Sequence, residues 1–160
     1  MYKHILIPTD GSELSEKAIE SAIELARVIH ARVTGFTAVP EYQVPQKAVL
    51  TSEDGRSEPH ILSPAEHKVT VKKQAELALQ TIAERAHAAG VDYDADFEQC
   101  DRPHEAIIRA AQAHGCDLIF MASHGRRGIS AVLHGSETQG VLTHSTIPAL
   151  VFRQAQPRPH

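Results

Sequence analysis

Residues 117–136, with the sequence DLIFMASHGRRGISAVLHGS, join an apolar run to a glycine-rich segment. The run 118–122 has no polar side chain, as expected for a central parallel strand that is covered on both faces. Three glycines follow within residues 123–135, and residues 136–139, SETQ, have the pattern of a capping box at a helix N-terminus. A buried strand, a glycine-rich loop and a helix start in this order indicate an α/β fold with a ligand site beyond the strand.

Strand and helix patterns alternate along the whole chain. Strands are expected at residues 4–8, 32–39, 91–98, 118–122 and 148–152. Helices are expected over the apolar stripe at 14–29, from a capping box at 63–66 to Gly90, from residues 101–103 to Gly115, and from Ser136 to about His144. This alternation predicts a doubly wound, five-stranded parallel sheet with helices on both faces, because parallel neighbours need helical crossovers.

Three segments carry more specific expectations. Residues 40–63 have no periodicity, and so long a loop is usually functional or disordered; it is either a lid that carries Tyr42 or a surface insertion. Residues 91–98 alternate apolar and acidic side chains, which predicts an edge strand with one buried face. We expect one domain over residues 1–153 and a disordered tail at 154–160.

The composition excludes several classes of protein. The chain of 160 residues has 16 basic and 20 acidic side chains, four Phe, three Tyr and no Trp, which argues against nucleic-acid binding. Its apolar runs are far shorter than the roughly 20 residues of a membrane span, and the N-terminus lacks the apolar core of a secretory signal. Cys100 and Cys116 form neither a disulfide framework nor a zinc motif, so a reducing cytoplasm is expected. The eleven histidines are expected to be solvated, with His124 as the exception.

The glycine-rich segment has the chemistry of an anion site. Its glycines let backbone amides approach a ligand, and the helix that begins near Ser136 directs unpaired N–H groups toward it. Arg126, Arg127 and His124 add positive charge, so phosphate is the expected anion. The alternative is a flexible surface loop with solvated arginines. Neither a Walker A motif nor a G-x-G-x-x-G fingerprint is present.

These segments resemble the universal stress protein family. The match includes residues 117–128, the opening HILIPTDGS at 4–12, and TIPALV at 146–151, and it extends over nearly all of residues 2–153. The resemblance implies a Rossmann-like fold of the adenine nucleotide alpha-hydrolase type. The nucleotide-binding branch has the motif G-x2-G-x9-G-[ST], in which Ala122 replaces the first glycine here. Alanine blocks binding only if this position needs a positive φ or very close backbone contact.

The resemblance also implies a set of nucleotide-binding residues. The candidates are Pro8, Thr9, Asp10, Val39, Met121, Ala122, Ser123, His124, Gly125, Arg126, Gly128, Gly135, Ser136 and Glu137. Pro8, Thr9 and the Val39 backbone would hold adenine, Asp10 would contact the ribose, and the residues from Ser123 to Glu137 would surround the ribose and phosphates. Asp10 has a second role open to it, as a turn residue that bonds to its own backbone.

The implied function is the binding of ATP, or another adenine nucleotide, as a regulatory ligand in the stress response. Any bound Mg2+ would be held by the phosphates. No dedicated catalytic group is evident, although slow ATP hydrolysis or phosphotransfer stays open as an alternative. A nucleotide-free interaction module is the other alternative. The short apolar strand Pro148–Phe152 is expected at a sheet edge, where a homodimer would form.

Overall fold

The computed structural model describes residues 1–41, 47–51, 57–123 and 135–153 of the chain. Its main sheet contains five strands: β1 (His4–Pro8), β2 (Arg32–Val39), β5 (Tyr93–Gln99), β6 (Leu118–Ala122) and β7 (Ala149–Phe152). They are all parallel and lie in the order β5-β2-β1-β6-β7. The predicted doubly wound, five-stranded parallel sheet is therefore confirmed.

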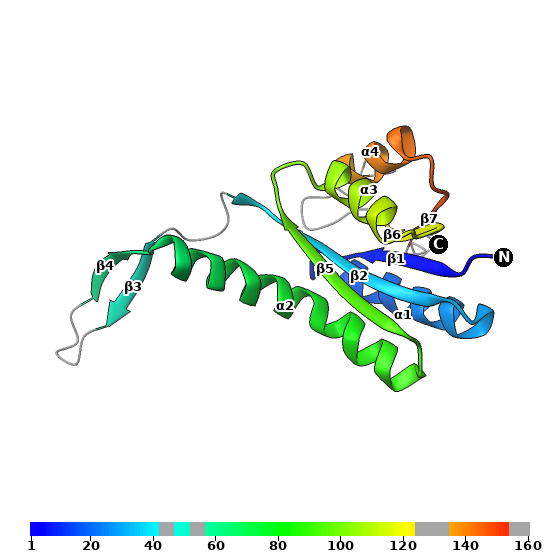
Figure 1. The fold of residues 1–160 in the computed structure, drawn as a ribbon, viewed down its shortest axis with the longest axis horizontal. Coiled ribbons are helices and arrows are strands. Elements are labelled where there is room, and N and C mark those ends of the chain that lie inside the picture. Colours follow the sequence, from blue (N-terminus) through cyan, green and yellow to red (C-terminus); the bar gives the residue numbers. More distant parts are fainter. Residues whose placement is uncertain (42–46, 52–56, 124–134, 154–160) are drawn as a thin grey trace, which may run out of the picture.

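Helices cover both faces of the main sheet (Figure 1). Helices α1 (Glu13–Ile29) and α2 (Pro64–Ala89) lie on one face, whereas α3 (Pro103–Ala113) and α4 (Ser136–His144) lie on the other. Strand β1 shows how the pleat divides the core: Ile5 and Ile7 pack toward α1 and α2, whereas Leu6 packs toward α3 and α4. This alternation gives one apolar core on each side of the sheet.

The segment after β2 is more ordered than its sequence indicates. Strands β3 (Lys47–Thr51) and β4 (Ser57–Ile61) pair antiparallel, with Lys47 opposite Ile61 and Thr51 opposite Ser57. The expected structureless loop over residues 40–63 is thus wrong, since two strands form within it. This small sheet lies at the N-terminal end of α2, away from the main sheet (Figure 1). Tyr42, the expected lid residue, lies outside the described residues.

Two helix N-termini show how local sequence sets the element boundaries. The capping box of α2 is confirmed: the Ser63 hydroxyl accepts from the Glu66 N–H at 3.3 Å, and the Glu66 carboxylate accepts from the Ser63 N–H at 2.8 Å. The expectation of a capping box at Ser136 is wrong, because Gly135 is the N-cap of α4 and makes no side-chain cap bond. In the same turn, the Thr138 hydroxyl donates to the Ala122 and Ser123 carbonyl groups.

Strand β5 occupies the sheet edge, as predicted, but its apolar side chains do not form a buried face. Ala95 is exposed and Phe97 keeps 36% of its surface exposed, because α2 covers this edge only in part. On the opposite face, the Asp96 carboxylate lies 2.8 Å from Nε2 of His114, the C-cap of α3, and Glu98 forms an ion pair with Arg109. The acidic row therefore packs beside α3 rather than only facing solvent.

The expectation that the histidines are solvated is wrong for His4, His104 and His114. His4 is 8% exposed, and its Nε2 lies 2.7 Å from the Thr34 hydroxyl. The side chains of His104 and His114 are half-buried beside Glu137 and Asp96. Each of these three imidazoles has a partner that burial requires.

Strand order reverses beside β1. The chain passes from β1 through β2 to β5 on one side, and then crosses to β6 and β7 on the other. The carboxyl ends of β1 and β6 flank this reversal, which is where open α/β sheets bind their ligands. In the described part of the chain, no helix combines the length and apolarity that a membrane crossing requires.

Candidate functional site

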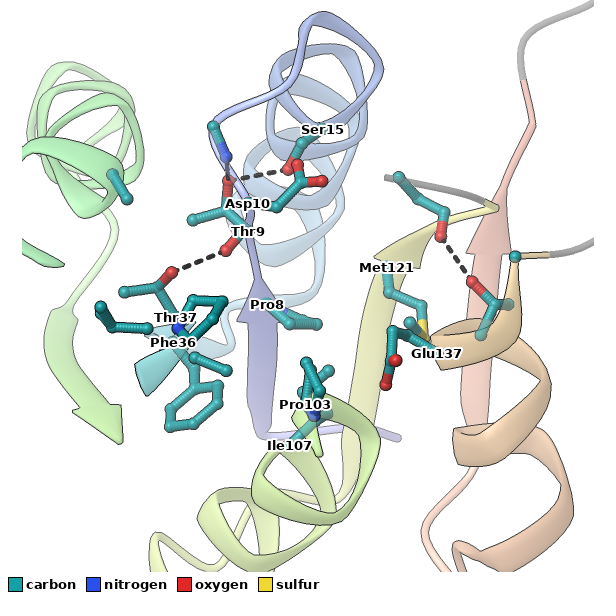
Figure 2. Close-up of a pocket in the computed structure, with 18 of the residues that line it drawn as sticks. Pro8, Thr9, Asp10, Ser15, Phe36, Thr37, Pro103, Ile107, Met121 and Glu137 are labelled. Atoms are coloured by element: carbon teal, nitrogen blue, oxygen red, sulfur yellow. Dashed lines mark hydrogen bonds between the residues drawn. The ribbon is translucent and has the colours of Figure 1, made fainter. Parts of the chain in front are cut away.

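A cavity of about 610 Å³ opens at the carboxyl ends of β1, β2 and β6. Helices contribute the remaining walls, and Figure 2 shows the labelled side chains that surround this space. The lining residues are Pro8, Thr9, Asp10, Gly11, Ser15, Glu16, Phe36, Thr37, Ala38, Val39, Pro40, Gln74, Leu77, Ala78, Thr81, Asp101, Pro103, Ile107, Met121, Ala122, Gly135, Ser136, Glu137 and Thr138. The cavity thus lies at the reversal of strand order.

Hydroxyl groups organise the wall between β1, β2 and α1. The Thr9 and Ser15 hydroxyls lie 2.7 Å apart, and the Thr37 hydroxyl donates to the Thr9 carbonyl at 2.9 Å. The Gly11 N–H donates to the Thr9 hydroxyl at 3.1 Å (Figure 2). Because all three hydroxyl side chains are nearly fully buried, these bonds hold the turn after β1 in place.

Asp10 lies on this turn and is exposed at the cavity. Its Oδ1 accepts a hydrogen bond from the Ser12 N–H at 3.0 Å. This is the turn role that the sequence leaves open for Asp10. The same carboxylate lines the cavity, so shaping the turn and contacting a ligand are compatible.

The wall toward α3 is apolar. Pro8, Phe36, Pro103, Ile107 and Met121 converge on one side of the cavity (Figure 2). Phe36, Ile107 and Met121 belong to the core between the sheet and helices α3 and α4. An apolar wall beside a hydroxyl-lined turn suits a ligand that has an aromatic ring and a polar part.

The N-terminus of α4 closes another side of the cavity. Gly135, Ser136 and Glu137 line it, and the Gly135 N–H donates to the Ser123 carbonyl at 2.8 Å. The Thr138 hydroxyl ties the same turn to the end of β6, at 3.1 Å from the Ala122 carbonyl. Unpaired N–H groups at a helix N-terminus favour anions, so this side of the cavity fits a phosphate group.

Glu137 joins the first turns of α3 and α4. Its Oε2 accepts from the His104 N–H at 2.7 Å and lies 3.1 Å from the His104 Nδ1. Helix α3 lacks a side-chain cap at Arg102, and Pro103 has no N–H, so Glu137 supplies the cap from a neighbouring helix. The His104 ring also stacks on His144, with 6.1 Å between the ring centroids.

The described part of the cavity lining contains no Lys or Arg, whereas it contains four carboxylates, those of Asp10, Glu16, Asp101 and Glu137. An anionic ligand therefore needs the α4 N-terminus or positive charge from elsewhere. Arg126 and Arg127, which are expected from the sequence to supply this charge, lie outside the described residues. Across the described ranges, no three His, Cys, Asp or Glu side chains group closely enough to hold a metal ion.

The end of β2 is tied to the end of β5. The Val39 carbonyl accepts from the Cys100 N–H at 3.0 Å. Burial raises the pKa of the Cys100 thiol, so this thiol is protonated at neutral pH and is a poor nucleophile. Cys100 therefore has a structural position next to the cavity.

The structure brings together most of the candidate residues that the sequence identifies. Pro8, Thr9, Asp10, Val39, Met121, Ala122, Gly135, Ser136 and Glu137 all line the cavity. Ser123 is buried behind them, and its N–H donates to the Phe152 carbonyl at 2.8 Å. His124, Gly125, Arg126 and Gly128 lie outside the described residues. The nucleotide contacts inferred for these residues remain predictions.

Sequence reasoning missed the wall contributed by α2, which consists of Gln74, Leu77, Ala78 and Thr81. The i, i+3, i+4, i+7 spacing of these residues marks one helix face. A partly polar stripe beside the apolar face of this helix is the sequence signal that could have identified these four residues. The spacing alone, however, does not show that this stripe faces the cavity.

The backbone at Ala122 bears on the first of the two conditions under which alanine would block binding, a need for a positive φ. Among the described residues other than glycine, His30 alone has a positive φ. Ala122 thus ends β6 with a conformation that any residue can adopt. The replacement of glycine by alanine imposes no backbone strain here.

Comparisons with known proteins agree with this architecture. The family model described as the universal stress protein family matches residues 1–153. Universal stress protein MJ0577 of Methanocaldococcus jannaschii is 27% identical over 159 residues, which cover 96% of each chain. The solved structure of MJ0577 matches with a TM-score of 0.76 at 25% identity, over 98% of this chain and 99% of that one.

Two further structures share the fold. A universal stress protein in complex with cAMP has a TM-score of 0.67 at 24% identity, over 96% of this chain and 99% of that one. The universal stress protein from Archaeoglobus fulgidus in complex with dAMP has a TM-score of 0.58 at 16% identity, over 95% and 98%. With a family match over nearly its full length, the chain belongs to the universal stress protein family.

Proposed function

We propose that this universal stress protein binds an adenine nucleotide, ATP or a related mono- or cyclic nucleotide, as a regulatory ligand in a cytoplasmic stress response. The observation that carries the proposal is the cavity of about 610 Å³ at the reversal of strand order, closed on one side by the N-terminus of α4. The cAMP and dAMP complexes of the two proteins that share this fold support the choice of nucleotide class.

The chemistry of the walls suggests how the nucleotide would lie. The apolar side formed by Pro8, Phe36, Ile107 and Met121 would pack against the adenine ring. Asp10 would accept a hydrogen bond from the ribose. The phosphates would lie at the α4 N-terminus, where Gly135 and Ser136 present the first turn of that helix.

Four carboxylates in the described lining bear on the charge of the ligand. They disfavour a bare polyphosphate, because like charges repel at short range. Mg2+ held by the phosphates would reduce this repulsion, as would Arg126 and Arg127 of the glycine-rich segment. A monophosphate or a cyclic nucleotide carries less negative charge and needs less compensation.

Mass spectrometry of the small molecules released from denatured, freshly purified protein tests the proposal. An adenine nucleotide is the expected species. A bound ligand stabilises the folded state, so the increase in melting temperature with ATP, AMP or cAMP ranks these ligands, and GTP serves for comparison. Absence of a released nucleotide, together with no shift for any of them, would favour a nucleotide-free interaction module. Phosphate release that Ser136→Ala abolishes would favour a slow ATPase instead.

We also propose that two copies associate through the outer edge of β7. This strand lies at the end of the sheet opposite β5, and Leu150 keeps 40% of its surface exposed. An apolar edge strand with free backbone groups pairs readily with a second copy. The dimer and the nucleotide site lie on different parts of the sheet, so each can be tested without the other.

A further inference from the structure

The α2 wall of the cavity differs from the other walls in having an amide side chain. Gln74, Leu77, Ala78 and Thr81 line the cavity from one face of α2. The adjacent face of the helix, with Val71, Ala75, Leu79, Ile82 and Ala86, is buried against the sheet and α1. The helix is therefore fixed in rotation, and its cavity-facing residues have defined positions.

Gln74 is half-buried, and its amide has no hydrogen bond to any residue in the described part of the chain. The hydroxyl groups of the wall between β1, β2 and α1 differ in this respect, because Thr9, Ser15 and Thr37 bond to one another or to backbone. An amide that lines a cavity offers one acceptor and two donors to a ligand. Gln74 is thus a polar group that is available for recognition.

The position of Gln74 along the cavity is set by its neighbours. Val71 and Ala75 pack with Val39 in a small cluster of their own, so Gln74 lies beside the end of β2. Pro8 and Phe36 of the apolar wall lie opposite each other on β1 and β2, so an adenine ring packed against them extends toward this end of the cavity. The Val39 carbonyl already accepts the Cys100 N–H at 3.0 Å, which leaves less backbone capacity to recognise a base edge there.

Resting on the proposed function, we propose that Gln74 selects the base by forming two hydrogen bonds to adenine. The amide oxygen accepts from the N6 amino group and the amide NH2 donates to N7, which is the pairing that glutamine makes with adenine. Guanine presents acceptors at both O6 and N7, so it would place its O6 against the amide oxygen. Gln74 is then a specificity-determining residue for adenine over guanine.

Calorimetric titration of the nucleotide-free full chain with ATP, GTP and 7-deaza-ATP tests this assignment. Since 7-deaza-ATP lacks only the N7 acceptor, the wild-type chain should bind ATP roughly tenfold more tightly than either analogue. In Gln74→Leu, which keeps the side-chain size, the three affinities should become similar. Gln74→Glu keeps an acceptor for N6 but loses the donor to N7, so ATP and 7-deaza-ATP should bind alike.

Gln80→Leu is the matched control. Gln80 lies on the same helix outside the cavity lining, and its amide donates to Glu84 at 2.7 Å. This variant should keep the wild-type preference, and a cooperative thermal transition in each variant checks that it is folded. A Gln74→Leu chain that keeps the wild-type preference for ATP would overturn the Gln74 assignment alone. No binding of ATP by the wild-type chain would contradict the proposed function and this assignment together.

Discussion

Ala122 is the residue at which this chain departs from the motif of the nucleotide-binding branch, and its backbone conformation does not require glycine. Ala122 ends β6 without a positive φ, and its carbonyl accepts the Thr138 hydroxyl at 3.1 Å. The added methyl group lies in the wall of an open cavity and packs in part against the core. Nucleotide affinity should therefore depend little on whether this residue is alanine or glycine.

Ala122→Gly tests this expectation. ATP affinity should change by less than about threefold, and the free energy of unfolding should fall by about 0.5–1 kcal/mol, because glycine within a strand costs backbone entropy. Isothermal titration calorimetry and urea denaturation measure the two effects. A large gain in affinity on restoring glycine would show that the Ala122 methyl group obstructs the ligand.

His4 is the residue whose burial predicts a pH dependence. Burial lowers the pKa of His4 below its ordinary value of 6.5, and the nearby Arg32 charge lowers it further. The unfolded chain therefore binds a proton at His4 that the folded chain does not, and stability falls as the pH drops through about 6.5. The effect is absent at higher pH, where His4 is neutral in both states.

In His4→Gln the titrating group is lost while an amide remains available to Thr34. The decrease in unfolding free energy between about pH 7.5 and pH 5.5 should be smaller than in the wild-type chain. The comparison of slopes isolates His4, because every other titratable group is the same in the two chains. Identical slopes, measured by urea denaturation at each pH, would show that His4 does not contribute.

At the scale of the elements, the contact between α3 and α4 depends on a glycine. A Cβ at Gly140 would lie 2.5 Å from Cγ of His104. The imidazole cannot move freely, because Glu137 holds its Nδ1 at 3.1 Å and His144 stacks on it. Gly140 thus permits the close approach that lets Glu137 cap α3, at the expense of helix propensity in α4.

Gly140→Ala should destabilise the chain by about 1–3 kcal/mol, since overpacking outweighs the gain in helix propensity. The double variant His104→Ala with Gly140→Ala should be less destabilised than the sum of the two single variants, because the clash is absent. Urea denaturation of all four chains completes the cycle. Additive effects would mean that the two side chains do not compete for the same space.

The main-sheet elements were predictable because each has a local signal. The capping box at Ser63 and the left-handed Gly90 mark the two ends of α2, and the apolar run 118–122 identifies β6 as a central strand. The N-terminus of α4 shows the limit of such signals. Thr138 bonds to the end of β6, and this tertiary contact leaves Gly135 rather than Ser136 as the cap.

Strands β3 and β4 were missed because their signals conflict. Residues 47–51 and 57–61 flank Asp54-Gly55, a dipeptide that favours hairpin turns. Pro59 argues against a strand, because proline has no N–H to donate to a neighbouring strand. Within sheets, proline is found mainly on edge strands. In a two-stranded sheet both strands are edges, which removes the conflict, but a sequence alone does not show how many strands will pair.

The same limit applies to the cavity. The sequence predicts that residues at the ends of β1, β2 and β6 line the cavity, because the carboxyl ends of parallel strands meet at one edge of the sheet. The wall formed by α2 was not predictable, since the rotation of that helix is set by packing between Val71, Ala75 and Val39. Contacts between elements far apart in the chain decide which polar side chains face the cavity.

At the scale of the whole molecule, β7 has one paired and one free edge within the described residues. Pro148 and Phe152 direct their carbonyl groups to β6, with distances of 2.9 and 2.8 Å to Ile119 N and Ser123 N. Because backbone groups alternate along a strand, Val151 directs its N–H to the opposite, outer side. That N–H is available for pairing with a second copy.

Val151→Pro should convert the proposed dimer into a folded monomer, because it removes an outward N–H and leaves the β6–β7 pairing intact. Light scattering coupled to size-exclusion chromatography measures the mass, and circular dichroism checks the fold. Val151→Thr, which keeps the N–H and the branched shape, is the matched control and should stay dimeric. A monomeric wild-type chain, or a Val151→Pro chain that stays dimeric, would contradict this interface.

Our central claim is that the cavity at the carboxyl edge of the sheet binds an adenine nucleotide against the N-terminus of α4. Isothermal titration of the nucleotide-free chain with ATP, in wild type, Gly135→Val and Thr143→Val, tests it most directly. Wild type and Thr143→Val, which is altered on α4 outside the cavity, should bind one nucleotide per chain with similar affinity. Gly135→Val should bind at least about tenfold more weakly, because its side chain fills the space beside the first turn of α4. Equal binding by all three chains, or no binding by wild type, would contradict the claim.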